Sequence, residues 1–354
     1  MTRGDTTTMN VAHTGRMSGS RLGPGREFDL IRALLDQHER LRSTMPRSDA
    51  VRLAAGDDAA VIDASPLVIS ADLSFEGIHF RRDWITASEI GWRATAAALS
   101  DLAAMAARPI GVLVTFAASS DDASFAMDVM AGVSEAVTAV AAELLGGDVS
   151  RSPGPFVIDV IVVGQAAHPV TRSGARPGDS VWVTGRLGGS AAAVAAWSAG
   201  RAPHPDARRR FAHPVPRIGE ARWLARAGAL HALIDLSDGL AGDARHLAAA
   251  SGVCVQLRLD RIPIDPSAAA QAPSGKSAAT PLGAPLRLAL GGGEDYELCF
   301  AAPASFTEEM AEVFRAEFGI ALTRVGSVVE GEGVVAVDEN GRAHALDVSG
   351  YSHM

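Results

Sequence analysis

Residues 291–297 read Gly-Gly-Gly-Glu-Asp-Tyr-Glu and close a series of acidic motifs that stand beside glycines or small residues. Each earlier member places a carboxylate at the edge of an apolar run: Gly56-Asp57-Asp58, Ser70-Ala71-Asp72, Ser100-Asp101, Gly146-Gly147-Asp148 and Asp235-Leu236-Ser237-Asp238. Carboxylates gathered at one site repel each other and lose solvation, so they are tolerated only when protonated or bridged by cations. Magnesium favours hard oxygen ligands and is usually held by a few carboxylates plus substrate phosphates. The series therefore predicts a site for Mg2+ and phosphate groups.

Helical phase singles out one of these carboxylates. Thr86-Ala-Ser-Glu89 has the pattern of a capping box and predicts a helix that continues to about Ala107. At 100° per residue, Asp101 falls within about 20° of both Ile90 and Ala94. Its carboxylate is therefore expected on the apolar face of the helix, where an acidic side chain needs a specific reason. We interpret Asp101 as a metal ligand.

In this order the motifs resemble those of the thiamine-monophosphate kinases, in the superfamily that also contains aminoimidazole ribonucleotide synthetase. The resemblance runs from about Glu27 to Tyr351 and is closest over residues 171–179 and 292–298. It implies a two-domain α+β fold, with an N-terminal α/β sheet domain that pairs in a homodimer and a C-terminal α+β domain. It also implies ATP-dependent phosphorylation of thiamine monophosphate to thiamine diphosphate, by direct in-line transfer assisted by several Mg2+ ions. No general base or covalent nucleophile is expected, because the acceptor is already an ionised phosphate.

The resemblance assigns roles to individual residues. The implied metal ligands are Asp58, Ser70, Ala71, Asp72, Asp101, Asp148, Asp235 and Asp238. The implied ATP contacts are Gly147, Asp148, Arg172 and Ser237, and the implied substrate contacts are His79, Glu294 and Tyr351. The chain departs from the family pattern at Ala71, Ala98 and Ala106, where a threonine, an asparagine and a glycine are usual. Ala71 leaves only its backbone carbonyl as a ligand.

Each of these residues also has a plainer interpretation. Asp57 and Asp58 suit a solvated β-turn, and Gly146-Gly147-Asp148 suits a tight turn. His79 suits an ordinary packed imidazole, and Arg172 suits a surface charge between the halves. Two other classes of protein also remain open: an ATP-dependent synthetase of the same superfamily, and a non-enzymatic scaffold that has kept the fold.

Length and composition favour two domains. With 354 residues, 47% of them hydrophobic, the chain can fill two ordinary cores. We expect a disordered extension over residues 1–26, an ATP- and metal-binding dimerisation domain over 27–166 and a C-terminal domain over 167–354. Cys254 and Cys299 lie in apolar runs without metal-ligand spacing and are predicted to be core thiols.

Charge excludes several classes of partner. The net charge is −9 and the isoelectric point is about 5.6, which argues against nucleic acid and anionic membranes. No apolar run reaches the ~20 residues of a membrane span, and no signal-peptide pattern is present, so we expect a cytoplasmic protein. The only lysine, Lys276, follows Gly275, but Ala270 replaces the first glycine of a P-loop. Phosphate charge must then be met by metal ions, arginines and helix N-termini.

Periodicity predicts the order of the elements. In the first half we expect strands at 60–62, 67–71, 111–116 and 156–164, helices at 86–107 and 122–145, and a turn at 146–148. In the second half we expect strands at 180–184, 232–236, 286–289, 296–300, 323–329 and 333–337, and helices at 190–199, 217–227, 238–251 and 305–318. Ser237 is a candidate N-cap for the helix at 238–251, and the stretch from Pro266 to Pro285 is predicted to be a surface loop.

Overall fold

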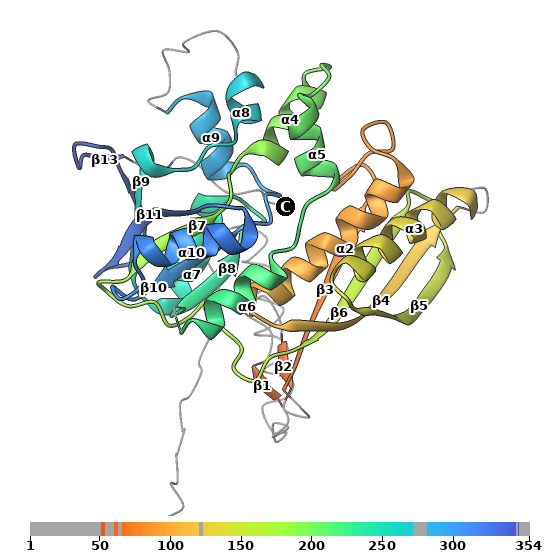
Figure 1. Cartoon of the computed structure of the whole chain (residues 1–354). Helices are drawn as coiled ribbons and strands as arrows, with labels where there is room; N and C mark the ends of the chain where they lie inside the picture. The colour runs from red at the N-terminus through yellow and green to blue at the C-terminus, as the bar shows by residue number, and fades with distance from the viewer. Residues whose placement is uncertain are drawn as a thin grey trace, which may run out of the picture.

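The computed structural model describes residues 51–53, 60–62, 66–119, 123–228, 230–271, 282–344 and 346. Their strands form two separate sheets with helices packed on them (Figure 1). The first sheet has the spatial order β1 (Val51–Leu53), β2 (Ala60–Ile62), β3 (Leu67–Phe75), β6 (Val157–Gln165), β4 (Arg108–Ala118), β5 (Glu143–Arg151). Its strand pairs are antiparallel except for β4 and β5, which run parallel.

The second sheet contains seven strands and carries the C-terminal half. Its order is β13 (Ala343–His344), β12 (Gly333–Val337), β9 (Cys254–Arg258), β11 (Leu322–Val329), β7 (Ser180–Thr184), β10 (Leu298–Ala302), β8 (Ala232–Asp235). The helices of this half are α4 (Gly189–Ser198), α5 (Pro205–Ala212), α6 (Ile218–Arg226), α7 (Leu240–Ser251), α8 (Pro266–Gln271), α9 (Ala284–Gly291) and α10 (Glu308–Phe318), with a 3-10 turn at Leu259–Arg261. The mixed α+β fold is therefore confirmed.

Helix α2 (Ala87–Ala104) is the element that both halves share (Figure 1). The predicted capping box is formed: Glu89 N donates to Thr86 Oγ1 at 3.3 Å, and Thr86 N donates to Glu89 Oε2 at 2.8 Å. The helix packs against α3 (Ala123–Ala139) and the first sheet, and also against β8, α5 and α6. Gly91 allows the close approach of α3, because a Cβ there would lie 1.8 Å from the Val129 carbonyl oxygen.

The two faces of the first sheet differ. Side chains along β6 alternate between buried and partly exposed, and the buried set faces the helices. Helices α2 and α3 cover that face in Figure 1, and no other described helix covers the opposite one. The opposite face still carries aliphatic residues, among them Leu73, which is 46% exposed, and the partly exposed Ile161 and Val163. We refer to it as the open face.

Five local predictions were wrong. Residues 286–289 belong to helix α9, not to a strand. Strand β5 contains residues 143–145, predicted as the end of a helix that instead stops at Ala139, and residues 146–148, predicted as a turn. Part of the predicted loop after Pro266 is helix α8. Helix α7 begins at Leu240 with Gly239 as N-cap and no side-chain cap, so Ser237 is not its N-cap.

Several predictions lie outside the described residues. They concern the extension over 1–26, the start of the fold near Glu27, and the residues Asp57, Asp58, Lys276 and Tyr351. Both cysteines are buried and free, as predicted. No helix among the described residues is long and apolar enough to cross a membrane.

Candidate active site

Two serine–carboxylate hydrogen bonds join the C-terminal part of α2 to both sheets. Ser70 Oγ on β3 donates to Asp101 Oδ2 at 2.5 Å. The next residue along the chain, Ser100, donates through Oγ to Asp235 Oδ2 at 2.6 Å, at the end of β8. Neighbouring residues on a helix point about 100° apart, so one turn of α2 reaches both halves. The structure thereby places the predicted ligands Ser70, Asp101 and Asp235 around one turn of α2.

Asp72 completes an acidic group at this junction. Desolvation, together with the nearby Asp235 carboxylate, raises the pKa of Asp72 to about 6, while the positive charge of Arg93 opposes the shift. The pKa of Asp235 is also raised by burial, against the hydrogen bond from Ser100 and the positive charge of Arg172. Arg172 is buried, so its interpretation as a surface charge was wrong. Carboxylates destabilised in this way are candidates for a bound cation.

Short backbone hydrogen bonds join the segment 235–238 to the acidic segment 291–297. Glu294 N donates to Ser237 O at 2.7 Å, and Tyr296 N donates to Leu236 O at 2.9 Å. Asp238 N donates to Asp243 Oδ2 at 3.1 Å, which fixes the turn into α7. Backbone hydrogen bonds therefore join the segment of the predicted nucleotide residue Ser237 and metal ligand Asp238 to the predicted substrate residue Glu294.

The residues fit a cation that also has phosphate ligands. Among the described residues, no three His, Cys, Asp or Glu side chains lie close enough to form a complete metal site. Asp58, a predicted ligand, lies outside those residues. Mg2+ is normally bound by one or two carboxylates with water and substrate phosphates in the remaining positions. The acidic group at the junction of the halves matches that donor set, and Ala71 offers only its backbone.

Gly147 and Asp148 lie apart from this group. A Cβ on Gly147 would lie 1.7 Å from the Val114 carbonyl oxygen, so glycine is required for β5 to pair with β4. By strand register, Gly147 is in the row of Asp72, whereas Asp148 is in the row of Leu73 on the open face. Asp148 is exposed, and its Oδ1 accepts a hydrogen bond from Val149 N at 2.9 Å. The described chain does not bring Asp148 to the acidic group.

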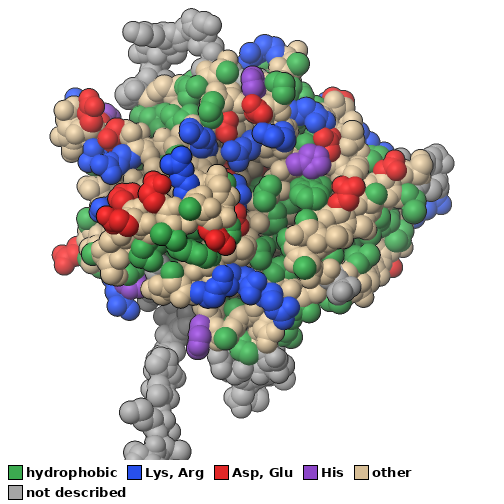
Figure 2. Space-filling model, viewed as in Figure 1, with side chains coloured by type: hydrophobic (Ala, Val, Ile, Leu, Met, Phe, Trp, Pro, Cys, Tyr) green, Lys and Arg blue, Asp and Glu red, His purple; other side chains and the backbone are tan. Residues whose placement is uncertain are grey.

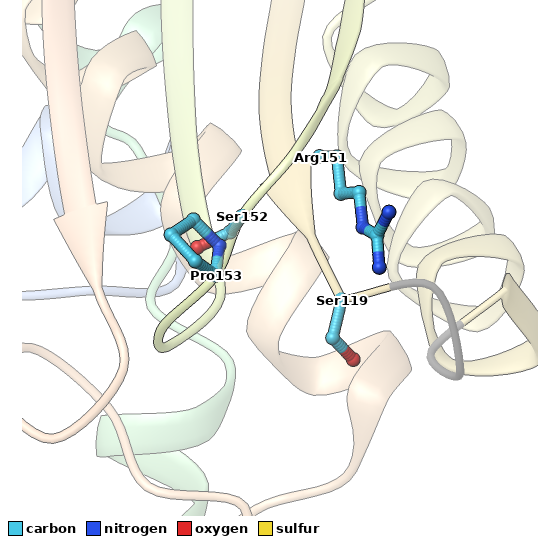
Figure 3. A pocket seen from close by; sticks show the side chains of 4 residues that line it. All are labelled: Ser119, Arg151, Ser152 and Pro153. Carbon is cyan, nitrogen blue, oxygen red and sulfur yellow. The ribbon is translucent and has the colours of Figure 1, made fainter.

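His79 lies just beyond the end of β3, at the same end of the first sheet as a shallow pocket. Phe75 N donates to His79 Nδ1 at 2.9 Å, which leaves the other ring nitrogen to act as the donor. The pocket has a volume of about 330 Å3 and is lined by Ser119, Arg151, Ser152 and Pro153 (Figure 3). In Figure 3 the Arg151 side chain extends from β5 toward Ser119 at the end of β4.

A second pocket lies at the junction of α2 with α5 and α6. Its volume is about 290 Å3, and its lining is Trp92, Arg209, Arg210, His213, Pro214, Val215, Arg217 and Asp295. The three arginines pair with carboxylates, as Arg210 does with Asp265 and Arg217 with Glu297. Figure 2 likewise shows basic and acidic side chains side by side on this face. The arginines therefore give the pocket no excess positive charge for an anionic ligand.

Sequence reasoning missed three residues of the site: Arg93, Ser100 and Tyr296. Arg93 and Ser100 lie on α2 and are both buried. Helical phase could have identified Arg93 as a neighbour of Ser100, because residues seven apart on a helix share a face. Burial raises the pKa of Tyr296, and its phenol lies within electrostatic range of Arg93 and Asp72. Tyr296 lies in a loop, and sequence periodicity does not predict the conformation of a loop.

The comparisons with known proteins agree with this architecture. Residues 56–166 match the family described as "AIR synthase related protein, N-terminal domain", and residues 176–339 match "AIR synthase related protein, C-terminal domain". The fold and the site thus define the class as two-domain AIR synthase related proteins.

Individual relatives identify the family within this class. The thiamine-monophosphate kinase of Rhodopirellula baltica is 36% identical over 300 residues, which are 82% of this chain and 87% of that protein. The Escherichia coli K12 thiamine-monophosphate kinase is 31% identical over 336 residues, 92% of this chain and 98% of that protein. The solved structure "AaThiL complexed with AMPPCP and TMP" is 28% identical with a TM-score of 0.76, and the match covers 94% of this chain and 99% of that one. The chain belongs to the thiamine-monophosphate kinase family.

Proposed function

We propose that this protein transfers the γ-phosphoryl group of ATP to thiamine monophosphate and so produces thiamine diphosphate and ADP. The observation that carries the proposal is the pair of hydrogen bonds by which Ser70–Asp101 and Ser100–Asp235 bring acidic groups of both halves together. Full-length relatives with this activity in their names and a family structure with an ATP analogue support it. No observation favours the synthetase alternative or a non-enzymatic scaffold.

The chemistry requires positioning and charge neutralisation more than proton transfer. Both the ATP terminus and the acceptor are phosphate anions, so they repel each other, and the acceptor oxygen needs no general base. Asp72, Asp101, Asp235 and Asp238 would hold Mg2+, which supplies positive charge to the polyphosphate oxygens. The buried Arg172 guanidinium lies near Asp235 and is suited to bind a phosphate oxygen. Glu294 is suited to the cationic thiazolium or the aminopyrimidine edge of the acceptor.

The direct test is product formation. Purified protein incubated with ATP, Mg2+ and thiamine monophosphate should form thiamine diphosphate and ADP in equal amounts, and chelation of Mg2+ should stop both. ADP formation without thiamine diphosphate would contradict the proposal. The cytoplasmic location expected from the sequence remains a prediction.

We also propose that two copies pair through the open face of the first sheet, within an N-terminal domain over residues 27–166. Aliphatic side chains on a solvent-facing sheet surface are typical of a protein interface. The exposed Asp148 lies on that face, so pairing would place it near the interface. Light scattering of the full chain should give twice the mass of the monomer. Leu73→Asp should yield monomers, whereas Val313→Asp, at a 58% exposed position on α10, should not. A monomeric wild-type protein would refute this arrangement.

A further inference from the structure

Arg93 is a buried cation in the middle of α2 that reaches into the C-terminal half. It is 4% exposed. Nη1 donates to the Phe211 carbonyl oxygen at 2.7 Å, and Cζ lies 3.8 Å from the centroid of the Phe211 ring. Nη2 pairs with Glu294 Oε2. A guanidinium can make these contacts together because it is planar and carries a fork of donors.

Glu294 is held in an uncommon conformation. Its φ is 72°, and that of Tyr296 is 48°, so both occupy the left-handed region that favours glycine. Such residues persist only when their surroundings over-determine them, and they concentrate at ligand sites. The hydrogen bond to Ser237 O fixes the Glu294 backbone, and Arg93 fixes its carboxylate.

The ion pair also lies at a buried oxygen of the Glu294 carboxylate. Oε2 is buried against Arg93, while the side chain as a whole remains 27% exposed. The exposed part of the side chain therefore lies away from Oε2. A carboxylate with one fixed oxygen offers a single directed acceptor, which favours one orientation of a ring that carries an amino group or a positive charge.

We propose that Arg93 is the positioning residue for Glu294 and, through it, a determinant of thiamine monophosphate binding. The inference rests on the proposed function. Arg93 does not touch the substrate; it acts across the boundary between the halves by holding the carboxylate that does. Nucleotide binding depends on other residues, the carboxylates of the junction and Arg172. Loss of Arg93 should thus weaken the acceptor site selectively.

Three variants test the proposal. Arg93→Met removes the guanidinium but keeps a long apolar side chain. Arg93→Lys keeps the positive charge but donates from a single nitrogen atom. Arg208→Met is the matched control, because Arg208 on α5 forms a bidentate pair with Glu89 on α2 at 2.8 and 2.7 Å. It joins the same two halves without touching Glu294.

We expect Arg93→Met to raise KM for thiamine monophosphate about tenfold or more, with KM for ATP changed less than about twofold. Arg93→Lys should recover part of this loss, and Arg208→Met should leave both KM values unchanged. Because Arg93 also acts on Asp72, nucleotide affinity should be measured directly as the rise in melting temperature with Mg-ATP alone. That rise should be the same in Arg93→Met as in wild type.

A double-mutant cycle completes the experiment. If Arg93 acts through Glu294, adding Arg93→Met to Glu294→Gln should change KM for the acceptor little further. Additive effects, an equal rise in both KM values, or the same loss in Arg208→Met would overturn the inference. Absence of thiamine diphosphate formation by the wild-type protein would refute the proposed function itself, and this inference with it.

Discussion

At the scale of single residues, the carboxylates of the junction are the proposed cation ligands. Their mutual repulsion can be measured through the pKa of Asp72. Its pKa is raised to about 6 by desolvation and by Asp235. Its ionised form is therefore destabilised in the folded protein without metal. The sequence put Asp72, Asp101 and Asp235 in one acidic series together with Asp148, which the described chain keeps apart, and it did not indicate that Ser70 and Ser100 hold two of the carboxylates. Those hydrogen bonds depend on the distance between α2 and two sheets.

The first prediction concerns Asp72→Asn and pH. A group whose pKa is raised on folding loses stability as pH increases from its unfolded pKa to its folded one, here from about 4 to about 6. Without metal, the variant and the wild-type protein should therefore have the same melting temperature at the lower of these pH values. Above the upper value the variant should melt higher, because Asn does not ionise. Melting curves of both proteins at several pH values in EDTA check this. A difference in melting temperature that does not change with pH would contradict it.

The second prediction concerns Asp101→Asn. Asn is nearly isosteric and its oxygen can still accept from Ser70, so the fold should survive and the metal-free protein should melt at a similar or slightly higher temperature. One anionic ligand is lost, so Mg-dependent turnover should fall on the order of 100-fold or more. Melting temperature and turnover are measured together. An unstable variant that remains active would instead show that Asp101 has a structural role.

At the scale of elements, local signals predicted some parts well and others poorly. The capping box at Thr86 and the phase of Asp101 located α2 because both signals are local. The short apolar run 286–289 fits a strand or a buried helix equally, and tertiary packing makes it α9. Gly146-Gly147 suggested a turn, yet Gly147 is needed inside β5 for its approach to Val114. In both cases the secondary structure depends on contacts with residues distant in the sequence, and a local pattern does not contain them.

The packing of α2 gives the third prediction. Gly91→Ala would place a Cβ 1.8 Å from the Val129 carbonyl oxygen, so α2 and α3 must separate and the protein should lose about 2 kcal/mol or more of stability. Gly219→Ala, in helix α6, meets only Phe318 Cε1 at 3.4 Å and should be neutral or slightly stabilising. Urea unfolding of both variants provides the comparison. Equal stability of the two would show that the α2–α3 contact is not tight.

At the scale of the whole molecule, the site exists only because two halves meet. Neither sheet holds the acidic group alone: Asp72 and Ser70 come from the first, Asp235 from the second, and α2 bridges them. The order of the motifs, together with the family resemblance, was enough to predict this gathering. The face that Asp148 occupies was not predictable, because it depends on strand register and not on the motif itself.

The central claim is that the acceptor is a phosphate anion brought to ATP by this acidic site. The most direct measurement is the ratio of kcat/KM for thiamine monophosphate to that for free thiamine, with Mg-ATP saturating. Free thiamine offers a hydroxyl that needs a base and lacks the phosphate that shares the cation, so the monophosphate should be preferred on the order of 100-fold or more. Phosphorylation of free thiamine at an equal or higher kcat/KM would contradict the account.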